Sequence, residues 1–279
     1  MDSGVADGLR VATLQRAEGS LRLAWAAEEG ATRLAELGQA GCLRACFPRA
    51  EPEDFTGAVV VNVSGGVAGG DRLAMTARIG AGARALITTQ AAERVYRAKD
   101  FEDPALLSTQ IEVGAGGCVE YLPQETILFD GGSFERSLQV KLAEDARFIG
   151  VEWVIFGRTA RGEQVRRGHV RDRVAIYRGA RLVWRDAVRL TGNLAAQLAR
   201  PAVARGAVGV ASLIYAGPDA GRRIDALRGA LAPFEAGASC WDDLLVARIL
   251  GQDGMELRRA VLAGLGVLRD GRGVPRVWN

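Results

Sequence analysis

The sequence predicts a mainly β fold of layered or β-helix-like stacked strands, with a few helices concentrated toward the C-terminus. Short strand-like segments recur with glycine turns between them, and the turn at 79–82 (Ile-Gly-Ala-Gly) is repeated at 113–116 (Val-Gly-Ala-Gly). Sustained helical spacing of apolar residues begins only after a last strand at 208–215. No linker-like segment interrupts the chain, so we expect one domain over residues 1–279.

The stretch 59–71, VVVNVSGGVAGGD, predicts a strand that runs into a sharp glycine corner carrying a carboxylate. Valine favours a pleated strand, and glycine permits positive φ or close backbone approach. A phosphate loop would need Lys and then Ser or Thr after the last glycine, whereas Asp71 and Arg72 follow. The spacing GGxxGGD also differs from the dinucleotide fingerprint G-x-G-x-x-G. A tight turn between two strands is the plain interpretation.

The remaining segments divide into strands and helices. Strands are predicted at 137–142 and 147–156, followed by a hairpin of 170–177 with 181–188. Residues 88–98 fit a short helix or an irregular loop crossing a sheet edge. Three helices are predicted near the end: 224–231, a second over 244–250 capped by Ser239, and a third over 255–268.

Composition limits the function classes. Hydrophobic residues make up 48% and charged residues 25% of the 279 residues, which indicates a globular protein. The net charge is only +3, and no Lys/Arg block with interleaved aromatics suggests nucleic-acid binding. The first residues are polar and acidic, without an apolar signal region, and no apolar run is long enough to span a bilayer. We therefore expect a cytoplasmic protein with no membrane or nucleic-acid partner.

Side chains that bind metals tightly are scarce. His169 is the only histidine, and we expect it in a surface turn, so most nucleophile–histidine schemes are excluded. Cys42 and Cys46 have no second Cys or His pair nearby, which favours buried thiols over a metal site. The acids that could form a catalytic pair are Asp71, Glu93, Glu120, Glu125, Glu152 and Asp186.

Two of these acids lie in largely apolar strands. Glu152 stands among Val151, Trp153 and Ile155, and Asp186 lies in the segment LVWRDAVRL. A carboxylate in such a strand needs a partner or a cation. A structural ion pair with one of the abundant arginines is the plain interpretation.

Several segments together resemble one known family. The segments are VVVNVSGGVAGGDRL, ALITTQAAERVYRA, VEYLPQETILFDGG, GVEWVIFGRTARGE and the closing PRVW, in this order. With them, the sequence resembles the urease accessory protein UreD (UreH) family over most of its length. The resemblance implies a mostly β scaffold in nickel-urease maturation rather than an enzyme. It also implies binding to apo-urease and to UreF, which recruits the GTPase UreG.

The family is thought to pass nickel toward urease through an internal water-filled tunnel. The resemblance implies nickel in transit and no tightly bound cofactor. Matching the acidic positions of the family gives the hypothesis that Asp71, Glu152 and Asp186 are weak, transient nickel stations. Carboxylates and water hold Ni²⁺ more loosely than imidazole or thiolate does, and a conduit must release its ion.

A scaffold between partners should also expose a contact surface. We expect that surface on the segment TTQAAERVYR, with Thr89, Gln90, Arg94, Tyr96 and Arg97, and on the C-terminal helices. The alternative function is a carbohydrate-active β-helix enzyme with paired carboxylates. The aromatic content of 6% counts against it, because sugar sites often use aromatic platforms.

Overall fold

Two facing β-sheets make up most of the computed structural model, which describes residues 15–51, 54–99, 103–158 and 161–278. The first sheet has seven strands, in the spatial order β14 (Arg181–Gly192), β13 (Gly168–Arg178), β11 (Ser133–Leu142), β8 (Ala105–Val113), β5 (Arg72–Ile79), β1 (Glu18–Glu28) and β2 (Ala31–Gly41).

The second sheet has ten strands. Eight form its main path, in the order β16 (Glu235–Trp241), β17 (Leu244–Gly251), β15 (Gly209–Ala216), β12 (Arg147–Phe156), β9 (Cys118–Leu122), β6 (Arg84–Thr89), β4 (Thr56–Asn62) and β3 (Leu43–Cys46). The short strands β10 (Thr126–Leu128) and β7 (Glu93–Val95) pair with each other, and β10 also pairs with β12.

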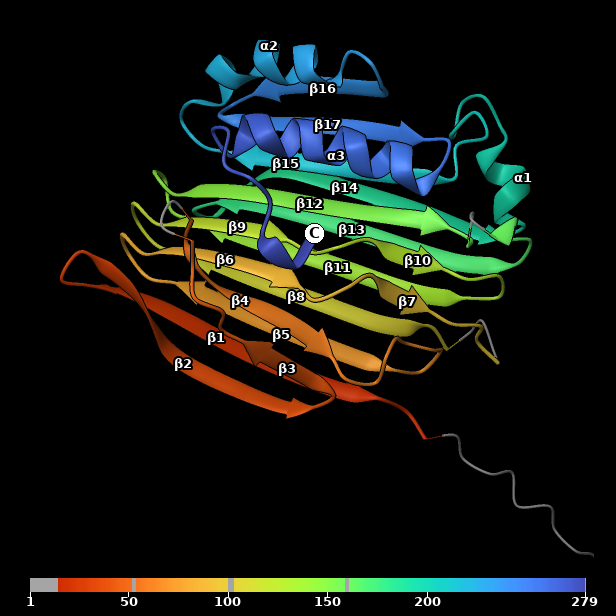
Figure 1. Cartoon of the computed structure of the whole chain (residues 1–279), viewed down its shortest axis with the longest axis horizontal. Helices are drawn as coiled ribbons and strands as arrows, with labels where there is room; N and C mark the ends of the chain where they lie inside the picture. The colour runs from red at the N-terminus through yellow and green to blue at the C-terminus, as the bar shows by residue number, and fades with distance from the viewer. Residues whose placement is uncertain (1–14, 52–53, 100–102, 159–160, 279) are drawn as a thin grey trace, which may run out of the picture.

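Through the middle of the chain, successive long strands alternate between the two sheets. The order β4, β5, β6, β8, β9, β11, β12, β13 moves from one sheet to the other at each step, and neighbours within each sheet pair in parallel. Figure 1 shows the resulting stack of coils, with β2 and β3 at one end and β16 at the other. This arrangement confirms the predicted mainly β, stacked fold.

A hydrophobic core fills the space between the sheets. In β1 the inward positions Leu21, Leu23 and Trp25 are 1–2% exposed and alternate with outward polar or small residues. A second core covers the outer face of the second sheet, where β12 contributes Val151, Trp153 and Ile155. Strand β12 is therefore buried on both faces, which explains its nearly continuous apolar sequence.

The α-helices of the described part of the chain lie in its last third, toward the C-terminus as predicted. They are α1 (Leu194–Leu198), α2 (Ala220–Leu231) and α3 (Gly254–Leu268), and the 3₁₀ turn η2 (Arg276–Trp278) follows them. Helices α2 and α3 pack on β15, β16 and β17 and supply Leu227, Leu257 and Leu265 to the second core. Among the described residues, none of the helices has the length and apolar content needed to cross a bilayer.

The prediction of a helix capped by Ser239 over 244–250 is wrong. Residues 235–251 form the antiparallel hairpin β16–β17, with Asp242 and Asp243 at positive φ in its turn. Both faces of β17 contact apolar side chains, so its run of leucine and isoleucine mimics a helical pattern. The other two C-terminal helices and the hairpin β13–β14 are confirmed.

The helix alternative for residues 88–98 is also wrong. Thr88 and Thr89 end β6, and residues 93–95 form β7. The backbone donors and acceptors here pair across to β10 and to the glycine corner rather than along a helix.

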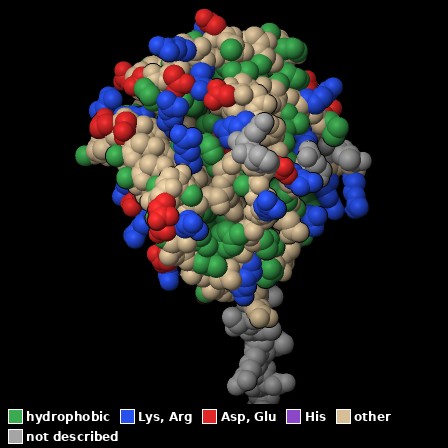
Figure 2. All heavy atoms as spheres, turned by 60° about the vertical axis from the view of Figure 1, so that its left-hand side comes forward, with side chains coloured by type: hydrophobic (Ala, Val, Ile, Leu, Met, Phe, Trp, Pro, Cys, Tyr) green, Lys and Arg blue, Asp and Glu red, His purple; other side chains and the backbone are tan. Residues whose placement is uncertain are grey.

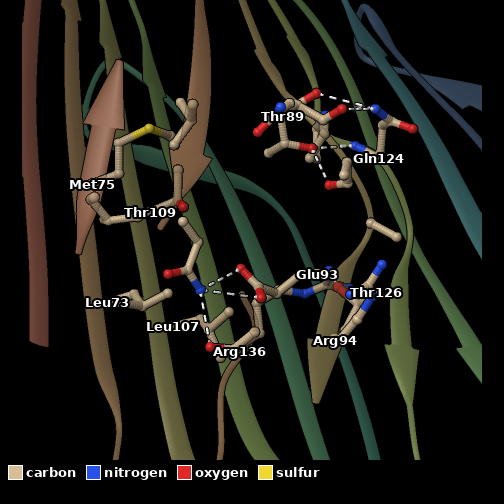
Figure 3. A pocket seen from close by; sticks show the side chains of 18 of the residues that line it. Leu73, Met75, Thr89, Glu93, Arg94, Leu107, Thr109, Gln124, Thr126 and Arg136 are labelled. Atoms are coloured by element: carbon tan, nitrogen blue, oxygen red, sulfur yellow. Dashed lines mark hydrogen bonds between the residues drawn. The ribbon is translucent and has the colours of Figure 1, made fainter. Parts of the chain in front are cut away.

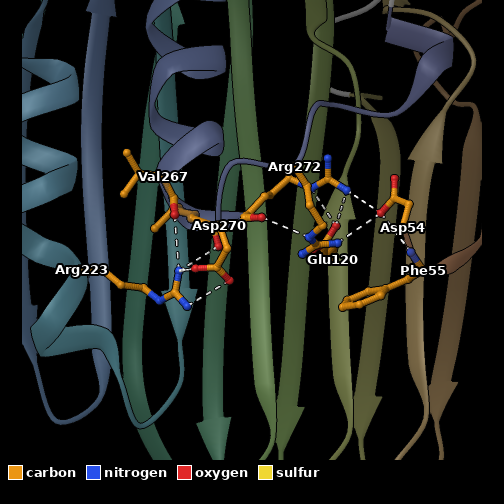
Figure 4. Close-up of polar contacts among 9 residues, drawn as sticks. Asp54, Phe55, Glu120, Arg223, Val267, Asp270 and Arg272 are labelled. Carbon is orange, nitrogen blue, oxygen red and sulfur yellow. Dashed lines mark hydrogen bonds and ion pairs between the residues drawn. The ribbon is translucent and has the colours of Figure 1, made fainter. Parts of the chain in front are cut away.

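An ion-pair cluster fastens the end of α3 to the second sheet. Arg269 is fully buried, with its guanidinium 2.8 Å from Glu120 of β9 and 2.7 Å from Asp54. Arg272 binds the same two carboxylates (Figure 4). Beyond it, the indole of Trp278 stacks on Trp153 with ring centroids 5.5 Å apart. The chain end therefore lies against β9 and β12.

The glycine corner is a tight turn, as predicted, and it pairs with the segment that follows β6. The Val67 N–H donates to the carbonyl of Arg94, and the Tyr96 N–H donates to the carbonyl of Val67, both at 2.8 Å. Gly65 and Gly66 have φ of 78° and 145°. A Cβ on Gly66 would lie 2.7 Å from the Arg94 carbonyl oxygen and 2.4 Å from the Tyr96 ring. Close approach thus requires glycine at this position.

Replacing Gly66 with alanine should therefore lower the free energy of unfolding by about 2–3 kcal/mol, since it adds backbone strain and a clash. Gly65→Asn is the matched control, because a side chain there meets open space and asparagine tolerates positive φ. Urea unfolding of both variants measures the difference. Equal stabilities of the two variants would contradict the assignment.

Candidate functional site

A cavity of about 260 Å³ lies between the two sheets behind the glycine corner. In Figure 3, Leu73, Met75 and Leu107 of the first sheet lie on one side, and Thr89, Gln124 and Thr126 lie on the other. Exposed residues at its rim include Gly65, Gln90 and Arg94, so the cavity reaches the surface there. Polar groups thus enter an otherwise apolar core at this place.

Hydrogen bonds hold the rim of the cavity in place. The Gln124 N–H donates to Thr89 Oγ1 at 2.9 Å, and its Nε2 donates to the Gln90 carbonyl at 2.8 Å. The same Nε2 also reaches the Val277 carbonyl at 3.3 Å. Gln124 therefore joins three segments that are distant in sequence.

Glu93 is the acidic group of the cavity near its rim. The Asn62 Nδ2 donates to both carboxylate oxygens, at 3.3 and 3.2 Å. Burial raises the pKa of Glu93 to about 6, against the Asn62 hydrogen bond that lowers it. The negative charge of nearby Asp71 raises the same pKa further. Glu93 therefore gains or loses its proton at about pH 6, just below neutral pH.

Arg136 is a buried cation in the lining of the cavity. It lies on β11, lines the cavity and is 11% exposed in its side chain. Its guanidinium contacts Asp172 of β13 at 3.1 and 2.5 Å, and its Nη1 lies 2.7 Å from Glu152 Oε2 and 3.1 Å from Thr126 Oγ1. One cation thus joins two carboxylates inside the stack.

The structure separates the three predicted nickel stations. Asp71 is 6% exposed and accepts the backbone N–H groups of Ala17 and Ala68, at 2.8 and 2.7 Å, so it closes the glycine corner instead of presenting a free carboxylate. Glu152 faces the space between the sheets beside Arg136. Asp186 of β14 forms an ion pair with Arg248 of β17 across the two sheets. Glu152 and Asp186 thus have the arginine partners that the apolar strands indicate.

Other potential metal ligands are dispersed. In the described part of the chain, no group of three or more His, Cys, Asp or Glu side chains is placed to hold a metal ion. Cys42 is buried but Cys46 is exposed, so the prediction of two buried thiols is wrong for Cys46, which ends the short edge strand β3. His169 lies within β13, not in a turn; its side chain is 14% exposed and Nδ1 is 3.0 Å from Thr191 Oγ1.

The predicted partner-binding residues line the rim of the cavity and the adjoining surface. Gln90, Arg94, Tyr96 and Arg97 are exposed, and Thr89 is half-buried. The Tyr96 hydroxyl donates to the Gly65 carbonyl at 2.9 Å, and Arg97 lies 3.4 Å from Asp130. The segment is therefore an ordered surface rather than a loose loop.

Sequence reasoning missed Arg136 and Asp172. A signal for both exists in the strand alternation. Arg136 falls between Phe134 and Leu138, and Asp172 falls between Val170 and Val174, on the phase of each strand that faces the core. A charged residue on the apolar phase of a strand indicates a buried partner, although alternation alone does not say which.

Comparison with known proteins gives one consistent family. Residues 17–279 match the family model described as UreD urease accessory protein. The chain is 45% identical to the "Urease accessory protein UreD" of Methylobacterium sp. (strain 4-46), over 95% of each protein. It is 43% identical to that of Rhizobium leguminosarum bv. viciae, covering 95% of this chain and 96% of the relative. The corresponding protein of Agrobacterium fabrum is 40% identical, covering 99% and 96%.

Glu93→Gln tests the electrostatics of the cavity. The raised pKa means that the folded protein binds this proton more tightly than the unfolded chain does. The contribution of Glu93 to the free energy of unfolding therefore falls as pH rises from about 4.5 to 6. The variant should match the wild type at pH 4 and exceed it by about 1–2 kcal/mol at pH 7. Urea unfolding of both proteins across this pH range measures the difference. If the free energies of unfolding of the two proteins changed with pH in parallel, burial of the Glu93 charge would have no effect on stability.

Proposed function

We propose, from the premise that the chain belongs to the urease accessory protein UreD family and takes part in urease maturation, that it is a non-catalytic scaffold for nickel delivery. In this proposal it binds apo-urease and UreF, and through UreF the GTPase UreG, in the cytoplasm. Nickel passes between its two sheets toward the urease active site and is not retained as a cofactor.

The observation that supports passage of an ion is the row of polar groups that continues from the cavity between the sheets. Arg136 pairs in register with Asp172, and Glu152 pairs with Ser212. Ser212 in turn pairs with Arg248, which binds Asp186 at the other end of the stack. Buried polar groups are normally satisfied by protein or water, so such a row favours a hydrated path.

The chemistry of this row fits transit rather than storage. Its side chains offer carboxylate and hydroxyl oxygens, which bind Ni²⁺ less tightly than imidazole or thiolate. The acids in it face arginines, which compete with a metal ion for the same oxygens. The carbohydrate-enzyme alternative has no specific support here, because Glu152 and Asp172 share one guanidinium.

Exposed apolar groups support a role between partners. Leu34, Leu37 and Phe47 are 38–43% exposed near the β2–β3 end of the stack. Figure 2 shows apolar side chains gathered on the lower part of the face in view, toward the β2–β3 end of the stack. Together with the ordered rim at 89–97, they give the chain surfaces suited to protein partners.

Isosteric replacement of the three predicted stations tests the proposal. Co-expression with urease subunits, UreF and UreG should show the Asp71→Asn/Glu152→Gln/Asp186→Asn variant lowering the nickel content of purified urease several-fold. Glu112→Gln, on the outer face of β8, is the control and should leave it unchanged. Co-purification of UreF with the variant would establish that assembly is intact. Wild-type nickel loading by the triple variant would rule these stations out.

Charge reversal tests the rim as a contact surface. Arg94→Glu/Arg97→Glu changes two exposed side chains. Of these two, only Arg97 forms an ion pair with another described residue, a surface pair of small energetic value. We expect weaker capture of UreF by the tagged variant, with unchanged thermal unfolding. Arg78→Glu, on the outer face of β5, is the matched control. Equal capture by both variants would place the UreF contact elsewhere.

A further inference from the structure

We propose that Arg136 is a resident cation that occupies the place of a divalent ion between Glu152 and Asp172, and so prevents this carboxylate pair from retaining nickel. The inference rests on the proposed function, and it assigns a role to a residue of this chain that is not itself a metal ligand. In this role Arg136 sets how tightly the interior binds a passing ion.

The geometry around Arg136 is that of an occupied cation site. Asp172 receives two parallel N–H groups of the guanidinium, the geometry that gives arginine–carboxylate pairs their strength. Glu152 and Thr126 approach the third nitrogen, Nη1, from the opposite sheet. Four oxygen atoms from strands β10, β12 and β13 therefore converge on one positive group. Oxygen donors converging in this way also suit a hard or borderline divalent cation.

The charges of the cluster do not balance with Arg136 alone. Two carboxylates face one guanidinium, and the Glu152 side chain is only 4% exposed. Among the described residues, neither oxygen of Glu152 accepts a hydrogen bond of good geometry, although Oε2 lies close to Nη1. Burial raises the pKa of Glu152, against the opposing charge of Arg136. The cluster thus has acceptor capacity on Glu152 that one monovalent cation leaves unused, and the raised pKa shows that one guanidinium does not fully offset the cost of burying the Glu152 charge.

The position of Arg136 relative to the cavity explains why the cluster would not trap an ion. Arg136 belongs to the cavity lining, whereas Glu152 and Asp172 do not. A cation coming from the cavity therefore meets the guanidinium before it reaches the carboxylates. It can bind them only by displacing Arg136, and that exchange lowers its net affinity. When the ion leaves, the guanidinium returns to its two partners.

Arg136→Met tests this directly, since methionine fills similar space without the charge. Titration of the full chain, co-purified with UreF, with Ni²⁺ alone should show one site at least about tenfold tighter than any in the wild type. Arg136→Lys keeps a cation and should behave as the wild type does. Arg136→Met/Glu152→Gln removes one of the two carboxylates and should lose the gain. A folded Arg136→Met variant with wild-type affinity, or an equal gain in the double variant, would overturn the proposal.

A substitute variant and a second measurement complete the test. Arg136→Gln, which can still hydrogen-bond Asp172, replaces Arg136→Met if the latter does not give a cooperative thermal transition. Nickel content of co-expressed urease then separates the two proposals. A tighter site with lower urease nickel supports both, because the ion stalls. A tighter site with unchanged urease nickel supports the role of Arg136 as resident cation but removes this cluster from the delivery route.

Discussion

The alternation of strands between two facing sheets is the constraint on which the rest of the structure depends. Each strand must place every second side chain between the sheets, so a charged residue on that phase is withdrawn from water. Arg136, Glu152 and Asp172 meet this condition only because β11, β12 and β13 bring them together. The same coil path that builds the core therefore also builds the polar interior.

The interior charges are placed where they compensate one another across the gap between the sheets. Arg136 of the first sheet reaches Glu152 of the second, and Asp186 of the first reaches Arg248 of the second. Such contacts contribute less to stability than packed apolar groups of similar volume, since both charges lose their hydration. Their presence in a core otherwise rich in valine and leucine favours a functional reason for keeping them.

Much of the fold could be predicted from the sequence, because it depends on local patterns. The glycine turns, the β13–β14 hairpin and helices α2 and α3 follow from residues close together in the chain. Strand β17 of the β16–β17 hairpin is predicted as a helix because apolar contacts on both of its faces remove the alternation that identifies a strand. The polar cluster is harder to predict. Glu152 is recognisable as a charged residue within an apolar strand, but the residues that lie beside it in space depend on sheet register, which cannot be read from the sequence.

The parallel coils also shape how the chain can fold. Neighbouring strands in the middle of each sheet come from successive coils, so Met75 pairs with Thr109 and Thr109 pairs with Leu138. Among the strands that the structure describes, those adjacent in sequence pair only near the ends of the two sheets, as β1–β2, β3–β4, β13–β14 and β16–β17. Local hairpins form in microseconds, whereas non-local parallel pairing must first close long loops. We therefore expect the ends of the stack to order early and the central coils to wait for them.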